Sequence, residues 1–165
     1  MRRLSASALF LFISGCTSSD KQLRIDDTAT MLSVLDPRAD KQLTRGFFPV
    51  EGLGRWTGRT FSATLKPPPN AGRRGAELVL RFGIAPQSIE VLRSIGLSAS
   101  VNGVPLSPES YARAGESEYV RDVPASAFQG GNATVDFVLE KALPPNGSER
   151  RELGVVATTL GFEAK

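Results

Sequence analysis

The sequence predicts an all-β protein, an antiparallel β-sandwich or jelly roll of about six to eight short strands. Two observations lead to this fold class. Apolar and polar residues alternate through much of the chain from Gly46 onward, and turns rich in proline and glycine separate the alternating segments. The length of 165 residues fits one small domain. From Gly46 onward, no segment outside residues 89–95 shows a sustained helical period.

Each expected strand follows from its own pattern. In chain order the expected strands are residues 60–66, 76–84, 97–106, 117–123, 132–140 and 152–163. Alternation places Phe61, Phe82 and Phe137 on the apolar faces of three of them, which makes these rings candidates for the core. Asn102-Gly103 lies between alternating apolar residues and is a strong signal for a tight hairpin. Residues 30–35 are expected to form a short helix or strand.

The N-terminus has the pattern of a signal peptide. Arg2 and Arg3 are followed by the apolar residues 9–13 and then by the small pair Ser14-Gly15. The apolar run is much shorter than the roughly 20 residues that a membrane-spanning helix needs. We therefore expect residues 1–15 to be a removable signal.

The single cysteine follows this signal directly. The segment Ile13-Ser14-Gly15-Cys16 resembles the lipobox of bacterial lipoproteins. The resemblance implies cleavage before Cys16 and acylation of that residue by chains such as palmitate, which together hold a protein firmly on a membrane. Because Thr17 rather than Asp follows Cys16, the resemblance favours the outer membrane, facing the periplasm or the exterior. An ordinary secretory signal with a chance cysteine is the alternative.

These features divide the chain into three parts. They are the signal peptide 1–15, the lipidated Cys16 with a flexible tether through residue 35 (16–35), and a β-sandwich domain over 36–165. Cleavage would remove Arg2 and Arg3 and lower the net charge from +3 to +1. A nearly neutral mature chain gives no reason to expect a nucleic-acid partner.

Missing residue types restrict the chemistry. The chain has no histidine and one cysteine, which excludes Ser-His-Asp and Cys-His catalysis, an internal disulfide and imidazole metal ligands. We expect no cofactor and no metal, and a calcium ion held by loop carboxylates is the alternative. A hydrolase that uses two carboxylates also stays open. Its candidate residues are Glu51, Glu77, Glu109, Glu116, Glu118 and Asp122.

Aromatic and charged residues provide the candidates for ligand binding. Trp56 is the only tryptophan, and it either packs in the core or forms part of a binding surface. Arg55 precedes it, and Tyr119 and Arg121 share one face of an alternating strand. With Glu51 these four residues form the predicted ligand-binding set.

Several motifs resemble one known module. Residues 46–51 (GFFPVE) and 55–58 (RWTG) resemble the opening of a β-sandwich module that occurs alone in bacterial lipoproteins or appended to glycosyltransferases and methyltransferases. Residues 101–103 (VNG), 119–124 (YVRDVP) and 151–155 (RELGV) match its later motifs in the same order. The resemblance covers about residues 36–162 and implies a jelly-roll sandwich similar to carbohydrate-binding modules, without an established activity. Glu149 departs from the pattern, which usually has Asp there.

We therefore expect a non-catalytic, lipid-anchored protein of the bacterial cell envelope that binds glycan or another envelope component. The alternative is a structural or assembly factor that holds a protein partner at the envelope. A small carboxylate-dependent hydrolase is the third hypothesis.

Overall fold

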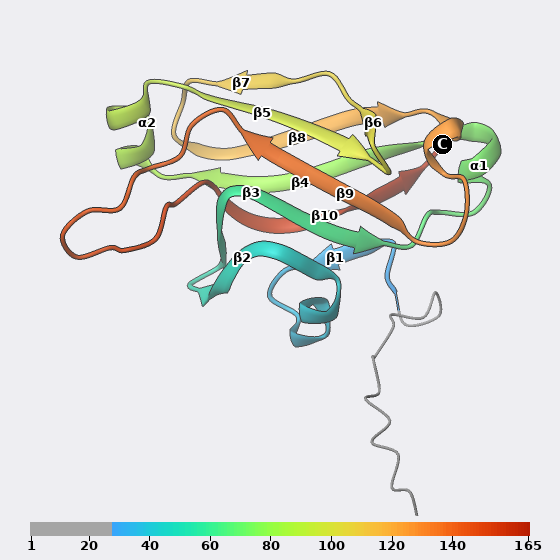
Figure 1. Cartoon of the computed structure of the whole chain (residues 1–165), viewed down its shortest axis with the longest axis horizontal. Coiled ribbons are helices and arrows are strands. Elements are labelled where there is room, and N and C mark those ends of the chain that lie inside the picture. The colour runs from blue at the N-terminus through green and yellow to red at the C-terminus, as the bar shows by residue number, and fades with distance from the viewer. Residues whose placement is uncertain (1–27) are drawn as a thin grey trace, which may run out of the picture.

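Ten antiparallel strands make up most of the computed structural model, which describes residues 28–165 (Figure 1). The predicted signal peptide, Cys16 and the first part of the predicted tether lie outside the described residues. Within the described part of the chain, no helix is long and apolar enough to cross a membrane.

The strands form one strongly curled sheet. Its main path has the order β6-β5-β9-β3-β10-β4-β8, with β1 beside β10, β2 beside β3 and β7 beside β5. The strands are β1 (Met31–Ser33), β2 (Leu43–Glu51), β3 (Gly54–Leu65), β4 (Ala76–Ile84), β5 (Ile95–Val101), β6 (Val104–Pro105), β7 (Glu109–Tyr111), β8 (Gly115–Val123), β9 (Ala133–Leu139) and β10 (Val156–Ala164). The predicted all-β class is confirmed. The strand number exceeds the expectation because β2 was not expected and because β1, β6 and β7 are only two or three residues long.

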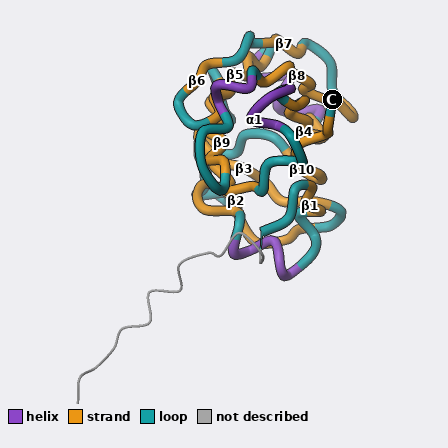
Figure 2. The backbone as a smooth tube through the Cα atoms, turned by 90° about the vertical axis from the view of Figure 1, so that its right-hand side faces the viewer, coloured by secondary structure: helices purple, strands orange, loops and turns teal. Residues whose placement is uncertain are grey.

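Strand β3 joins the two layers of the fold. Its first residues pair with β10, through Arg55 with Ala157 and Trp56 with Val156. Its later residues, from Thr60 onward, pair with β9. The sheet therefore turns over at β3 and closes around one interior, as the view along the strands shows (Figure 2). Four short helices connect the described strands: α1 (Ala71–Arg74), α2 (Pro86–Leu92), and the 3-10 helices Pro37–Lys41 and Ala125–Ala127. Helices α1 and α2 lie at opposite ends of the sandwich (Figure 1).

Large apolar side chains from both layers fill the interior. Phe61 of β3 stacks on Phe137 of β9 with ring centroids 4.8 Å apart, and Tyr119 of β8 meets Phe137 edge-on. All three side chains are fully buried. Phe82 is also buried, so the three phenylalanines that alternation assigned to the core lie there. Such rings bury large areas and account for much of the stabilisation of a small sandwich.

The described fold begins before residue 36, the predicted start of the domain. Strand β1 pairs with β10, and Leu32 and Val34 are buried. Gly161 of β10 permits the close approach, because a Cβ there would lie 2.5 Å from the Cα of Met31. Residues 31–34 thus belong to the sandwich and shorten the predicted tether.

A tight turn and a short helix lie at two positions that the sequence pattern indicated. Asn102 and Gly103 join β5 to β6 with φ angles of 48° and 81°, the positive pair that a type I′ hairpin turn requires. The stretch at residues 89–95 corresponds to α2, which begins at Pro86 and ends at Leu92. Proline suits this position because the first turn of a helix does not need its N–H.

Candidate functional site

Trp56 is the half-buried residue between two buried ones on β3. Arg55 and Thr57 face inward, so alternation along the strand turns Trp56 to the opposite side. There the indole lines an open cleft of about 440 Å³. We call it the tryptophan cleft. Its polar lining includes Glu51, Gln87, Asn146, Glu149 and Arg151, and its apolar lining includes Val91, Leu143, Pro144, Pro145 and Leu153.

Two sequence motifs meet beside Trp56. The backbone of Thr57 bonds with that of the segment before β10: Gly154 N donates to Thr57 O at 2.7 Å, and Thr57 N donates to Val155 O at 2.8 Å. Gly154 is required by this approach, because a Cβ there would lie 2.6 Å from the Thr57 hydroxyl oxygen. The RWTG and RELGV segments are therefore held in direct contact, which places Arg151 near Trp56.

Arg151 is the centre of the polar side of the cleft. Its Nε donates to one oxygen of Glu149 at 2.9 Å and its Nη2 to the other at 2.7 Å. Its Nη1 donates to Glu51 at 2.5 Å, and the guanidinium lies 5.0 Å from the ring centre of Phe48. Glu149 and Arg151 thus make a bidentate ion pair.

These bonds fix the charge state of the cleft. The hydrogen bonds from the Arg151 side chain and backbone lower the pKa of Glu149 to about 2. The same pairing raises the pKa of Arg151, through Glu149 first and then Glu51. Glu149 is therefore a carboxylate at neutral pH, and it accepts hydrogen bonds only.

Arg55 lies apart from Trp56, on the inner face. Its Nε donates to Val34 O at 2.6 Å and its Nη2 to Asp40 at 2.5 Å, and its side chain is 11% exposed. These contacts join β3 to the segment after β1 and to the 3-10 helix Pro37–Lys41. Arg55 therefore anchors the N-terminal part of the fold, and it lines a separate pocket with Asp40 rather than the tryptophan cleft. Its role in ligand binding stays a prediction.

Tyr119 and Arg121 also take structural positions. They share one face of β8 as predicted, but that face points inward and Tyr119 is fully buried. The Tyr119 hydroxyl and the Arg121 Nε both donate to Ser107 O at 2.8 Å. Arg121 also pairs with Glu109 at 2.7 Å and stacks over the Tyr119 ring. Of the five predicted residues, Glu51 and Trp56 line one cleft, and Tyr119 and Arg121 contact each other elsewhere in the fold.

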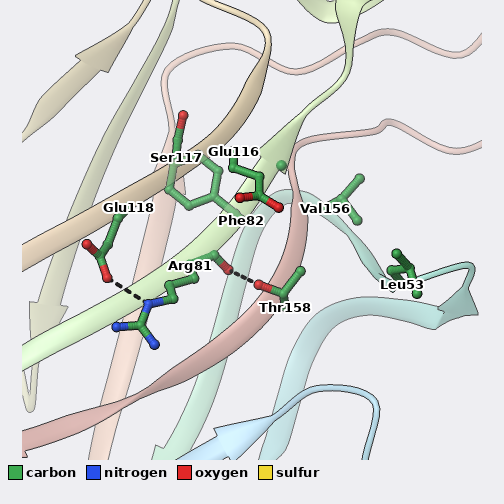
Figure 3. Close-up of a pocket in the computed structure, with 9 residues that line it drawn as sticks. Leu53, Arg81, Phe82, Glu116, Ser117, Glu118, Val156 and Thr158 are labelled. Atoms are coloured by element: carbon green, nitrogen blue, oxygen red, sulfur yellow. Dashed lines mark hydrogen bonds and ion pairs between the residues drawn. The ribbon is translucent and has the colours of Figure 1, made fainter.

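A second cleft opens on the outer face of β10, β4 and β8, with a volume of about 550 Å³ (Figure 3). We call it the sheet cleft. It is lined by Leu53, Arg81, Phe82, Gly83, Glu116, Ser117, Glu118, Val156 and Thr158. Arg81 Nε donates to Glu118 at 2.8 Å, and Thr158 donates its hydroxyl to Arg81 O at 3.0 Å. Leu53, at the tip of the β2–β3 hairpin, is 85% exposed.

Sequence reasoning missed the sheet cleft and the Arg151 network. The contact between Glu51 and Arg151 spans 100 positions, and local patterns carry no signal for it. Among the described residues, no group of three or more histidine, cysteine, aspartate or glutamate side chains is placed to hold a metal ion.

Solved structures of other proteins resemble this chain in fold. No protein-family model matches the chain, and no curated protein matches it. The CBM36-1 domain of a multidomain xylanase from the hindgut metagenome of Trinervitermes trinervoides is 12% identical, with a TM-score of 0.42 over 80% of this chain and 95% of that one. The Clostridium perfringens ZmpB structure with CBM51-2 in complex with GlcNAc and INT domains is 14% identical, with a TM-score of 0.36. That match covers 82% of this chain and 28% of the other.

Proposed function

We propose that this protein is a non-catalytic glycan-binding module that holds a sugar against Trp56 in the tryptophan cleft. The observation that carries the proposal is the position of the single tryptophan, half-exposed beside an ordered network of charged groups. An indole offers a flat apolar face with a polar N–H, which suits the carbon face and hydroxyl edge of a sugar ring. Val91 and Pro144 extend the apolar side of the same cleft.

The charge balance of the cleft favours a neutral sugar. Arg151, the cation of its lining, is already paired with both Glu51 and Glu149. A polyanionic glycan would have to compete with two carboxylates for that guanidinium. Gln87 and Asn146 add neutral polar groups to the lining, which suit hydroxyl groups.

The same network supports binding without hydrolysis. Glycoside hydrolysis requires one carboxyl group that is protonated at working pH and a second carboxylate across the bond. Glu149 has a pKa of about 2, so it carries no proton to donate near neutral pH. Its two oxygens and one oxygen of Glu51 already accept hydrogen bonds from Arg151.

The cellular setting of this module rests on the sequence. We infer attachment through acylated Cys16 to the bacterial cell envelope, with the outer membrane favoured by Thr17. The test is incorporation of labelled palmitate by the full chain and by the Cys16→Ser variant. Label in the wild-type chain and its loss in the variant are expected. Equal labelling of the two chains would contradict the inference.

Binding of neutral sugar oligomers tests the proposed function. We expect the domain to bind β-1,4-linked glucose or N-acetylglucosamine hexamers more tightly than polygalacturonate fragments of equal length. Trp56→Ala should abolish this binding, whereas Trp56→Phe, which keeps a flat ring, should retain part of it. Val138→Ala is the control, because Val138 is exposed on β9 and outside both clefts. No binding of any of these oligomers, or binding that is independent of Trp56, would contradict the proposal.

A further inference from the structure

We propose that the ligand is an extended polysaccharide chain, bound along one groove that runs from the tryptophan cleft across Val156 and Gly83 into the sheet cleft. This inference rests on the proposed function and adds the length and path of the ligand. It assigns a binding role to the outer face of β10, β4 and β8, which is separate from Trp56 in sequence.

A row of directly paired residues connects the two clefts. Trp56 pairs with Val156, Val156 pairs with Gly83, and Gly83 pairs with Glu116. Side chains of directly opposed residues share one face of a sheet. Since neighbouring strands lie about 4.8 Å apart, the row spans about 14 Å from β3 to β8. A ligand of that reach must contain several linked units.

The tip of the β2–β3 hairpin belongs to both clefts. Glu51 lines the tryptophan cleft, and Leu53, two residues further on, lines the sheet cleft. The hairpin tip therefore stands beside the boundary between the two clefts. A chain that leaves Trp56 meets the exposed Leu53 side chain as it passes over Val156.

Gly83 is one of the residues that line the sheet cleft. Its φ lies outside the left-handed region, so the backbone does not require glycine there. A Cβ at this position would meet only the Val156 Cβ, at an ordinary contact distance of 3.9 Å. Packing does not require glycine either. Its lack of a side chain keeps the path between Val156 and Glu116 open.

The walls of the sheet cleft differ in chemistry. Leu53 and Val156 supply apolar contact, while Arg81, Glu116 and Glu118 supply polar groups. Arg81 bonds Glu118 at 2.8 Å and lies 4.0 Å from Glu163, so its charge is balanced as that of Arg151 is. Both clefts therefore favour the same class of ligand, a neutral sugar with an apolar ring face and a hydroxyl edge.

A peptide is a poorer occupant of this groove. Extended peptides usually bind by adding a strand to an open sheet edge, where unpaired backbone groups are available. Under the groove, β10 and β4 have a neighbouring strand on each side. Recognition over these two strands must therefore come from side chains, which suits a polysaccharide, and of the described strands along the path only β8 at its end has an open edge.

Calorimetric titration with a ladder of neutral oligomers tests the groove. The probes are β-1,4-linked glucose and N-acetylglucosamine oligomers from dimer to hexamer. The affinity should rise with length until the groove is filled.

Gly83→Leu should weaken binding of the hexamer by about tenfold, equivalent to about 1.4 kcal/mol. It should leave binding of the dimer unchanged. Val138→Ala, which changes an exposed side chain outside both clefts, is the control and should bind both probes as the wild type does.

A second variant tests the groove independently, in case Gly83→Leu does not fold. Leu53 is 85% exposed, so Leu53→Ala should leave the thermal midpoint unchanged and still weaken binding of the hexamer. The proposed groove would be contradicted if the dimer and the hexamer bound with equal affinity. It would also be contradicted if neither Gly83→Leu nor Leu53→Ala changed the affinity for the hexamer. If Trp56→Ala still abolished binding in that case, the proposed glycan binding at Trp56 would hold and only the extended groove would be wrong. If no oligomer bound at all, both proposals would fail.

Discussion

Glu51 and Arg151 form an ion pair at 2.5 Å across 100 positions of the chain, and this contact fixes the tip of the β2–β3 hairpin against the segment that leads into β10. Glu149 completes the pair from the other side at 2.7 Å. Trp56 lines the same cleft. The polar wall of the proposed site is thus set before any ligand arrives, which reduces the entropic cost of binding.

Loss of Arg151 should weaken both the fold and the site. Arg151→Ala would leave Glu51 and Glu149 without their shared cation, so we expect a lower midpoint of urea denaturation and weaker binding of the glucose hexamer. Arg151→Lys should recover only part of each loss, because an ammonium group cannot make the bidentate contact. Full recovery by lysine would argue against a geometric role for the guanidinium.

The ionisation of Glu149 should make stability depend on pH in acid. Its pKa is about 2 in the folded protein against 4.5 for the free side chain. The stabilisation from its ionised form is therefore complete above pH 4.5 and is lost as the pH falls from there toward 2. Thermal midpoints across this window should fall less steeply in Glu149→Gln than in the wild type.

Asp36, whose pKa is also about 2 because of Arg38, titrates in the same window. The Asp36→Asn variant separates its contribution, and identical slopes for Glu149→Gln and wild type would contradict the assignment.

Removal of Arg55 should affect stability but leave binding intact. Arg55→Met keeps an unbranched apolar side chain and deletes the donors to Val34 O and Asp40. An unpaired carbonyl group in this largely buried position should cost about 1–3 kcal/mol in the free energy of unfolding. Hydrogen exchange should increase in residues 31–41, and affinity for the glucose hexamer should match that of the wild type. If the Arg55→Met variant folded stably but lost affinity for the glucose hexamer, Arg55 would be part of the binding site.

The aromatic core should be the most sensitive part of the fold. Phe61 is fully buried and stacks on Phe137. Phe61→Ala should lower the free energy of unfolding by about 3–5 kcal/mol, measured by urea denaturation. The control Val138→Ala removes an exposed side chain from the strand beside it and should change stability little. If Phe61→Ala and Val138→Ala lowered the free energy of unfolding by similar amounts, Phe61 would not be part of the core.

Local patterns predicted much of the fold. The alternation in residues 76–84 coincides with the bounds of β4, and Asn102-Gly103 makes the expected turn. Both features depend on residues that are neighbours in the sequence, so a local sequence pattern can predict them. Strand β1 lies within residues 30–35, where either a helix or a strand was expected. Strands β2 and β7 were not predicted, because β7 has only three residues and β2 is irregular, with three register shifts against β3.

Tyr119 and Arg121 show why the site was harder to predict. Alternation correctly placed the two residues on one face of β8, but it does not say which face the other layer covers. Trp56 and Arg55 are adjacent in sequence and therefore point to opposite sides of β3. The partners of Trp56 come from the hairpin tip, α2 and the segment before β10. Only the folded chain brings these segments together.

Fluorescence titration of the one tryptophan tests the central claim most directly. Because Trp56 is the only tryptophan in the chain, its emission reports on the tryptophan cleft alone. Addition of the glucose or N-acetylglucosamine hexamer should shift this emission to shorter wavelength and saturate, since a sugar ring against the indole displaces water. An emission spectrum that stays unchanged while calorimetry records binding would place the glycan elsewhere and contradict the account.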